Sequence, residues 1–396
     1  MNLNSYRKQI GLIYLIPFIL YLLDPFGKGF LFGYILILSL ILNTKKLILF
    51  FDRDFVFVSF FSISYALFYA VELKSGVQFI FIYALFPGFF YLLGKYLMVD
   101  GIRPRQIVVL LFSIGFIFSL SSLISVLINL REGGFAQLNR DIPIFWNGKA
   151  TKATLMAAYL TFNMTIPIIF LIRKPKTPIL LQLIGGVIFI ASLLSVFRLG
   201  SRTQLVICIL SIVLSLFFVI PRQSFKTNVQ LFFFILLLSA LVLKFVPLNL
   251  DADYFSVLGS RLQESDNTGS AGGRTSLWMN AIENLFIHPF GWQGPNVRYA
   301  HNLWLDVARY AGLVPFFLLI VFTLRSLKNT VKAVRKAPKE LLLNNTIIVF
   351  TLSCMLIFFV EPIMEGLFFL FTVYCLFQGI INAYLKQPIA EIDLQK

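Results

Sequence analysis

Charged residues are scarce in this sequence. Only 13% of its 396 residues are Asp, Glu, Lys or Arg, whereas 58% are hydrophobic. Soluble domains carry roughly 25% charged residues, and a soluble core could not bury this much Leu, Ile and Phe. The composition therefore excludes an ordinary soluble protein and predicts that lipid surrounds much of the chain.

Acidic residues are scarcer than basic ones, with 18 Asp and Glu against 34 Lys and Arg and a net charge of +16. In a soluble protein such an excess would indicate nucleic-acid binding. Here the basic residues lie in short segments between apolar runs, where they set the orientation of membrane helices. The expected partner is the lipid bilayer, and no nucleic acid is expected.

Histidine and cysteine are also rare, with two and three residues. Cys208, Cys354 and Cys375 each lie inside an apolar run without CxxC spacing, so neither a disulfide framework nor a metal site is indicated. No His, Asp or Glu pattern has metal-ligand spacing either. We therefore expect no metal and no cofactor.

Apolar runs dominate the rest of the sequence, and most approach the roughly 20 residues that cross a bilayer. They predict an all-α polytopic membrane protein, with residues 1–396 forming a single integral membrane domain and the first run remaining uncleaved. Twelve membrane-spanning helices are expected at about 9–23, 29–43, 54–71, 77–98, 106–130, 153–172, 178–197, 203–220, 228–247, 301–324, 341–360 and 366–385.

The distribution of Lys and Arg predicts the orientation of these helices. Basic residues concentrate in alternate connections if both termini, including a tail at 386–396, are cytoplasmic. The two long loops, 131–152 and 248–300, then lie outside the cytoplasm. Because long loops are usually functional, we expect 248–300 to be a catalytic loop.

The connection between the seventh and eighth spans carries two arginines. Ser201 and Gln204 have capping-box spacing, which predicts that a helix begins at Ser201 with Arg202 in its first turn. A helix amino terminus combined with an arginine forms an anion site, and Arg198 lies one turn away. Alternatively, both arginines extend towards phospholipid headgroups.

The second half of the long loop predicts an amphipathic helix at the membrane interface. Its apolar residues fall on one face at helical spacing: Trp278, Ile282, Leu285 and Phe286. Arg274 lies at the start of this helix, again at an amino-terminal end that favours anions.

The predicted span 301–324 begins with an unusual group of polar residues. Asn302, Asp306 and Arg309 are spaced by four and three residues and share a helix face. Charges inside a span face a cavity or each other, so these residues either line a site or form a structural Asp306–Arg309 pair.

The two histidines differ in position. His288 precedes a proline at the predicted end of a helix and is expected to cap it, whereas His301 lies at the mouth of the tenth span. Histidine is well suited to proton transfer near neutral pH.

We expect His301, Arg202 and Arg274 to meet in one extracytoplasmic vestibule and to act as catalytic residues. Arginines would stabilise a departing phosphate, and the histidine would take the proton of an attacking hydroxyl. A metal-free displacement at a carbon that bears a phosphate or pyrophosphate is the simplest chemistry for this set.

Several motifs between about 190 and 325 together resemble the bacterial O-antigen ligase and O-antigen polymerase superfamily. They are Gly200-Ser201-Arg202, Gly273-Arg274 with Trp278, His288-Pro289 followed by Gly291 and Gly294, and His301-Asn302-Leu303 with Gly312. The resemblance implies a membrane-embedded glycosyltransferase. Such enzymes take a glycan from an undecaprenyl-pyrophosphate carrier at the outer face of the bacterial inner membrane.

By motif, the resemblance implies that Arg202 and Arg274 bind the pyrophosphate and that His301 lies at the reaction centre. The residues expected to contact substrate around them are Arg198, Trp278, Asn302, Asp306 and Arg309.

Three activities remain open from the sequence. A polymerase would use another lipid-linked repeat unit as acceptor, and a chain-length regulator is a compatible partner. A ligase would use the lipid A core. We favour the polymerase because diverged, Phe- and Ile-rich members are more often polymerases. A lipid-linked glycan transporter (flippase) is the alternative from another class. It should place ionisable residues near the membrane midplane, whereas here they gather at the outer ends of spans.

Overall fold

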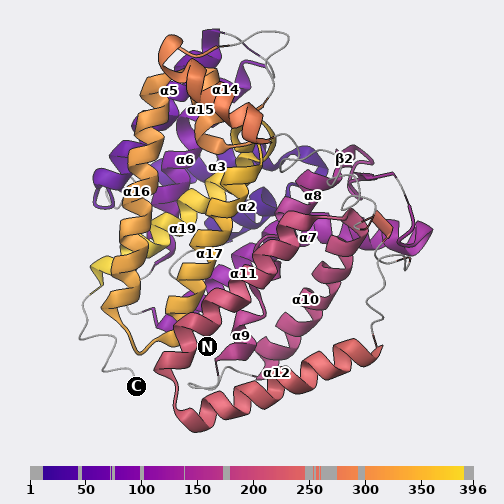
Figure 1. Ribbon diagram of the computed structural model, residues 1–396. Coiled ribbons are helices and arrows are strands. Elements are labelled where there is room, and N and C mark those ends of the chain that lie inside the picture. The colour runs from indigo at the N-terminus through magenta and orange to yellow at the C-terminus, as the bar shows by residue number, and fades with distance from the viewer. Residues whose placement is uncertain are drawn as a thin grey trace. The chain divides into compact units, whose positions relative to one another are not determined.

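The computed structural model describes residues 12–42, 47–71, 73, 76–98, 102–137, 139–172, 179–245, 253, 256–257, 259, 274–292 and 299–387. Within these ranges the chain is almost entirely helical, apart from one two-stranded sheet (Figure 1). The chain divides into two compact units, which are described separately. Unit 1 comprises 1–107, 270–337 and 354–396, and unit 2 comprises 108–269 and 338–353.

Unit 1 contains the first helices, the end of the long loop and most of the last three spans. Its elements are α2 (Leu12–Leu23), η1 (Pro25–Gly27), α3 (Gly29–Ile41), α5 (Arg53–Val71), α6 (Gln78–Leu97), α14 (Arg274–Ile287), α15 (Leu303–Ala311), α16 (Leu313–Lys336), α18 (Ile363–Gly366), α19 (Phe368–Lys386) and the second part of α17 (Leu341–Val360).

Unit 2 contains the middle helices, the sheet and the first part of α17. Its other elements are α7 (Pro104–Gly133, from Val108 onwards), β1 (Asp141–Pro143), β2 (Ala150–Lys152), α8 (Ala153–Tyr159), η2 (Asn163–Thr165), α9 (Ile168–Leu171), α10 (Ile179–Leu199), α11 (Arg202–Val219), η3 (Ile220–Arg222) and α12 (Phe225–Phe245).

The core of unit 1 is built around α6, which packs against α5 and α19. A Cβ atom at Gly94 would lie 2.0 Å from the Leu376 carbonyl oxygen, so the backbones of α6 and α19 are in direct contact. Aromatic rings fill the space towards α2, where the Tyr21 and Phe90 centroids lie 4.3 Å apart. Large apolar side chains at this density of packing fix α6 and α19 as the scaffold of the unit.

The predicted single span 153–172 is broken in the structure. Helix α8 and the segment Asn163–Leu171 meet at an angle of 56°. Buried Asn163 donates hydrogen bonds to Ser119 Oγ at 2.7 Å and Ser192 Oγ at 3.0 Å, so it links the break to α7 and α10. These hydrogen bonds satisfy a buried amide at the break, and apolar periodicity could not reveal them.

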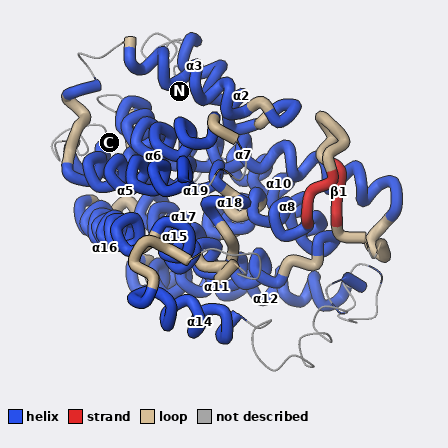
Figure 2. Tube along the Cα trace, turned by 90° about the horizontal axis from the view of Figure 1, so that it is seen from above, coloured by secondary structure: helices blue, strands red, loops and turns tan. Residues whose placement is uncertain are grey.

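The predicted loop 131–152 contains regular structure. Strands β1 and β2 pair antiparallel, with Asp141 opposite Lys152, and the hairpin lies beside α8 in Figure 2. Helix α7 also extends to Gly133, into the predicted loop.

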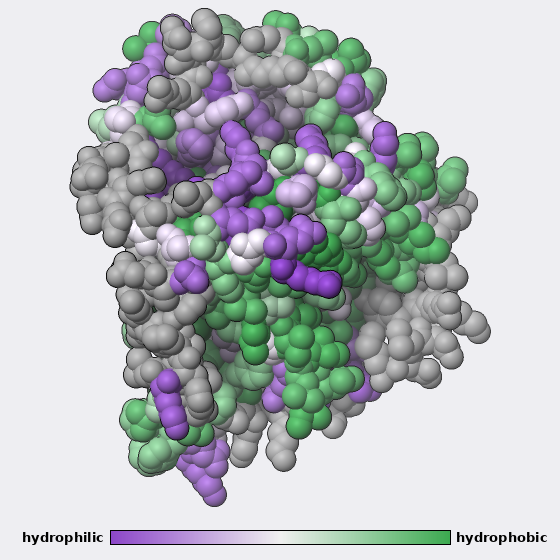
Figure 3. Space-filling model, turned by 90° about the vertical axis from the view of Figure 1, so that its right-hand side faces the viewer, coloured by the Kyte–Doolittle hydropathy of each residue, from purple (hydrophilic) through white to green (hydrophobic). Residues whose placement is uncertain are grey.

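Eight helices are long and apolar enough to cross a membrane in the described part of the chain, and the bent pair gives a ninth if it forms one span. Shorter apolar helices occupy Tyr14–Leu23, Gly29–Ile41 and Phe225–Leu237. Each of the twelve predicted runs overlaps one of these helices or the bent pair. Many apolar side chains face outwards, as the green areas of Figure 3 show, which is expected of a surface in contact with lipid.

The predicted span 301–324 is wrong in its first part. The helix stops at Gly312, where φ is +78°, and α16 begins at Leu313. A Cβ atom at this position would lie 2.2 Å from the Pro289 carbonyl oxygen, so only glycine fits the break. Asn302, Asp306 and Arg309 therefore lie in a short helix before the span and not within it.

Candidate functional site

Helix α15 begins with a reciprocal set of hydrogen bonds. The Asn302 side chain accepts a hydrogen bond from the Leu305 amide at 3.2 Å and caps the helix. The Asp306 carboxylate accepts from the Ala300 amide at 2.8 Å and from the Asn302 amide at 3.1 Å. Both side chains are buried, so together they fix the backbone on either side of His301.

His301 has a strained backbone. Its φ of 52° lies in the left-handed region, which non-glycine residues rarely adopt. Such strain costs on the order of 1 to 3 kcal/mol and concentrates at functional sites. The Trp278 Nε1 donates to the Ala300 carbonyl at 2.8 Å, so α14 also holds this turn. The half-buried imidazole is therefore presented at a position that several contacts define.

Arg309 lies at the centre of a buried charge cluster. Its Nη2 donates to Glu365 Oε1 at 3.1 Å, its Nε lies 3.5 Å from Asp306 Oδ1, and its guanidinium stands 4.9 Å from the centre of the Tyr299 ring. The cluster confirms that Asp306 and Arg309 pair, as the spacing allowed. It also adds Glu365 and Tyr299 to the site.

Burial raises the pKa of Asp306 to about 6, against the opposing effects of Arg309 and the two backbone amides. Burial and the neighbouring Glu365 raise the pKa of Tyr299, while Arg309 lowers it. Such displaced pKa values are common where charge is used functionally.

Helix α14 brings Arg274 to the same end of unit 1. Arg274 is the first helical residue, is 31% exposed and has its Nη2 3.8 Å from Glu361 Oε1. Its guanidinium therefore keeps donors available for an anion at the amino terminus of the helix. One turn later, Trp278 contacts the turn before His301. The structure thus brings together the Arg274, Trp278 and His301 motifs.

The predicted helix forms as α14, and its apolar residues fall within one broad arc that is only partly buried. Ala281 and Leu285 are buried and, with Trp278, face the protein. Ile282 and Phe286 point outwards and are 49% and 70% exposed. One part of the apolar arc therefore packs against unit 1 and the other part is exposed, and the interfacial position of the helix stays a prediction.

The segment after α14 closes on α15. The Leu313 amide donates to the Pro289 carbonyl and the Trp292 amide donates to the Arg309 carbonyl, both at 2.8 Å. His288 is exposed beside this segment, and its backbone amide continues the helix by donating to Asn284. The 289–292 segment therefore packs against the end of α15 and holds it in place.

Arg198 and Arg202 lie in unit 2 and have different surroundings. Arg198 is 1% exposed and donates from Nε to Asn129 Oδ1 at 2.9 Å, and from Nη1 and Nη2 to the Gln137 and Asn139 carbonyls at 3.3 and 3.0 Å. These bonds hold the end of α7 and the segment that follows it to α10. They favour a structural function for Arg198, and its contact with substrate stays a prediction.

Arg202 is placed as the sequence indicated. Ser201 is the N-cap residue of α11 and Arg202 is the first helical residue. The capping-box hydrogen bonds do not form, however, because Ser201 makes no side-chain cap and Gln204 donates instead to Thr161 Oγ1 at 3.3 Å. Within the described residues the Arg202 guanidinium has no ion pair or hydrogen bond. It remains available for an anion.

Sequence reasoning missed Glu361 and Glu365, the partners of Arg274 and Arg309. Both lie in the short segment between α17 and α19, and the acidic pair at a spacing of four beside Pro362 was the available signal. Metal-ligand clusters of three or more His, Cys, Asp or Glu residues are absent from the described ranges. Whether the Arg202 motif meets the other two motifs stays a prediction.

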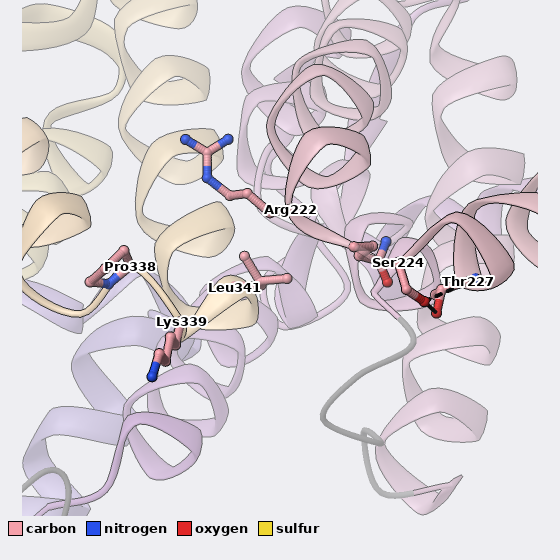
Figure 4. Close-up of a pocket in the computed structure, with 7 residues that line it drawn as sticks. Arg222, Ser224, Thr227, Pro338, Lys339 and Leu341 are labelled. Atoms are coloured by element: carbon pink, nitrogen blue, oxygen red, sulfur yellow. Dashed lines mark hydrogen bonds between the residues drawn. The ribbon is translucent and has the colours of Figure 1, made fainter.

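A separate cavity of about 520 Å³ lies in unit 2, lined by residues from the α11–α12 connection and from the start of α17. Figure 4 shows the Ser224 and Thr227 hydroxyls hydrogen-bonded to each other, at 2.8 Å, apart from the Arg222 side chain. The Arg222 Nη1 donates to the Phe218 carbonyl at 2.7 Å. None of the predicted site residues lines this cavity.

Comparison with known families supports the motif analysis. The model of a family described as O-antigen ligase matches residues 187–320. This range includes Arg198, Arg202, Arg274, Trp278, His301, Asn302, Asp306 and Arg309. The resemblance to the O-antigen ligase and polymerase superfamily is therefore confirmed. No curated protein matches the chain.

Proposed function

We propose, from the resemblance of residues 187–320 to the O-antigen ligase family, that this protein is a polysaccharide polymerase of the bacterial inner membrane. It would transfer a glycan from undecaprenyl pyrophosphate to a sugar hydroxyl of another lipid-linked repeat unit. The proposal includes twelve spans, cytoplasmic termini and a reaction centre that faces the periplasm or the cell exterior. The apolar helices and the family support a multi-pass membrane enzyme in general terms.

The observation that carries the proposal is the His301 turn. A histidine in a strained backbone conformation is held from one side by Asp306 and from the other by Trp278, one turn from Arg274. A structural histidine does not need such strain, whereas a reacting group benefits from a fixed position.

The proposed reaction needs only the acceptor hydroxyl and the lipid-linked glycan as reactants. The acceptor hydroxyl attacks the anomeric carbon, the new C–O bond forms, and the bond from that carbon to the pyrophosphate oxygen breaks. His301 takes the hydroxyl proton, and Arg274 stabilises the charge on the departing pyrophosphate. Arg202 is assigned the same kind of charge stabilisation through the resemblance. We expect the mechanism to need no metal.

The ligase remains the second candidate because the matching family carries that description. A ligase would use the same His301 and Arg274 chemistry but a lipid A core as acceptor. The two activities therefore share a reaction centre and differ in the acceptor alone.

Surface polysaccharide from a deletion strain, compared with the parent by gel electrophoresis, separates the candidates. If the lipid A core carries one repeat unit and no ladder, the protein polymerises. If the core is bare while lipid-linked polymer accumulates, it ligates. Lipid-linked single units confined to the inner leaflet would identify a transporter and would contradict the proposed chemistry.

Complementation of that strain tests the reaction centre. We expect His301→Ala to lower glycan transfer by about 10²-fold or more, as for loss of a general base, at an unchanged membrane level. His288→Ala is the matched control, because the second histidine is exposed and its imidazole makes no hydrogen bond with the residues that the structure describes. A normal ladder with His301→Ala would overturn the assignment.

A further inference from the structure

Unit 1 has a second polar centre, separate from the His301 turn. A cavity of about 440 Å³ is lined by residues that precede or begin α5 and by residues near the ends of α16 and α19: Asp52, Arg53, Asp54, Arg325, Asn329, Lys332, Asn382, Leu385 and Lys386. Three candidate membrane spans thus contribute to one cavity. The site already described uses none of these residues.

The acidic residues of the cavity are already paired. Asp54 is 4% exposed and accepts hydrogen bonds from Arg325 Nε, from Asn329 at 2.6 Å and from Asn382 at 3.1 Å. Asp52 accepts from Lys95, and from Lys386 at 3.2 Å. Burial raises the pKa of Asp52, but the Lys95 hydrogen bond and the Phe55 amide bring it below its ordinary value, so the carboxylate is charged.

The basic residues exceed the acidic ones. Four cations line the cavity against two carboxylates, and buried Lys95 adds a fifth positive charge to the cluster. Arg53 and Lys332 have no ion pair among the residues that the structure describes. The cavity also lies at the amino terminus of the 19-residue helix α5, whose dipole favours an anion. The net positive potential therefore selects a negatively charged ligand.

The buried side-chain amide of Asn382 requires that the ligand also provide a hydrogen-bond donor. Asn382 is 8% exposed, lines the cavity and donates to Asp54 through Nδ2. Its Oδ1 is buried and accepts no hydrogen bond from any described group. A ligand with a hydroxyl beside its negative charge would satisfy this oxygen.

The position of the cavity favours a lipid as the source of that anion. The apolar part of α16 ends at Leu324, and the basic part begins at Arg325, so the cavity lies at the level of headgroups. Leu324 and Val331 are 60% and 48% exposed on the same helix and provide surface for acyl chains. Basic pockets between membrane helices are known to bind anionic lipid headgroups.

We propose that this cavity binds the headgroup of an anionic phospholipid that carries a free hydroxyl, such as phosphatidylglycerol. The phosphate lies among Arg53, Arg325, Lys332 and Lys386, and a headgroup hydroxyl donates to Asn382 Oδ1. The lipid bridges α5, α16 and α19 at their polar ends, and it belongs to the leaflet on the side opposite the reaction centre.

Native mass spectrometry of the full-length protein in mild detergent tests this site. Phosphatidylglycerol should bind the wild type, and phosphatidylcholine should not compete. Lys332→Gln/Lys386→Gln should weaken binding about 25-fold, since each of the two basic residues near a headgroup contributes about fivefold. The matched control is Lys328→Gln/Arg335→Gln, which removes two exposed charges from the same helix end without touching the cavity.

Four results would overturn the proposal or part of it. Equal weakening in both double variants would mean that overall charge, and not the cavity, attracts the lipid. Equal thermal stabilisation by inorganic phosphate would identify a free anion as the ligand. Equal binding of phosphatidylethanol, which has the charge but no hydroxyl, would remove the function of Asn382. If the double variant is unfolded without lipid, the single variants Lys332→Gln and Lys328→Gln are compared instead. Equal binding of the lipid by these two variants would overturn the site.

Discussion

Asp306 fixes the backbone that carries His301, the proposed general base. Its carboxylate accepts hydrogen bonds from the amides on both sides of His301. Asp306→Asn keeps the volume but turns an NH2 group towards one of the two amides. We expect a loss of about 1 to 3 kcal/mol in stability and at least a tenfold loss of transfer activity, measured by thermal unfolding in detergent and by the glycan ladder. Full activity would show that His301 does not depend on this carboxylate.

The raised pKa of Asp306 predicts that the stability of the fold depends on pH. Because the folded pKa of Asp306 is raised from 3.8 to about 6, the folded protein holds this proton more tightly than the unfolded chain. The stability contributed by Asp306 is full below about pH 4 and is lost as the pH rises through about 6. The melting temperature of the wild type should therefore fall more steeply over this window than that of Asp306→Asn. Parallel curves would contradict the raised pKa.

Arg198 and Arg202 are only four residues apart, yet their substitutions should have different effects. Arg198→Ala removes three hydrogen bonds and empties the space of a side chain that is 1% exposed, so the amount of folded protein in the membrane should fall. Arg202→Ala removes no described contact, so the protein level should stay normal while the glycan ladder is lost by about 10²-fold. Quantitative immunoblots beside the ladder distinguish these outcomes. A wild-type ladder with Arg202→Ala would remove its proposed function in charge stabilisation.

At the scale of elements, the break at Gly312 determines where α15 ends. Its φ of +78° and the 2.2 Å approach of the Pro289 carbonyl to a Cβ atom exclude any side chain. Gly312→Ala should therefore destabilise the protein by about 2 kcal/mol or more and should lower its melting temperature. Gly186→Ala in α10 is the control, because a Cβ there meets only the Phe170 ring, at 3.6 Å. Equal effects would show that the break is not specific to glycine.

Helix positions could be predicted from the sequence because apolar run length is a local property. The start of α11 was also predicted, since Ser201 is a typical N-cap residue. The start of α15 lies close to the predicted beginning at 301, but the capping function of Asn302 was not predicted. The break before α16 was missed because its cause is the Pro289 carbonyl, which belongs to another segment. The Glu365 partner of Arg309 and the Asn129 partner of Arg198 were missed for the same reason, since they lie 56 and 69 residues away in the chain.

At the scale of the whole molecule, the charge distribution predicts which ends of the helices face the cytoplasm. The three native cysteines are buried and should give little background in thiol labelling. Single cysteines at Lys149 and His288, both exposed, should react with an impermeant reagent added to intact cells. A cysteine at Lys339 should react only after lysis. The reverse pattern would invert the topology and place the His301 turn on the cytoplasmic side.

The contacts within each unit agree with that distribution. In unit 1, segments predicted to be cytoplasmic contribute Asp54, Arg325 and Lys386 to one cavity, whereas segments predicted to be external contribute Arg274 and Glu361 to one ion pair. In unit 2, the predicted external loop contributes Asn139 to the contacts of Arg198.

The exposed apolar side chains of α14 have a practical consequence for purification. Met279, Ile282 and Phe286 are 54%, 49% and 70% exposed on a helix that begins with Arg274. A detergent belt that covers the long spans need not reach this helix, which then faces bulk water. Extracted enzyme should therefore lose turnover before it loses its folded spans, and returning it to lipid discs should restore that turnover.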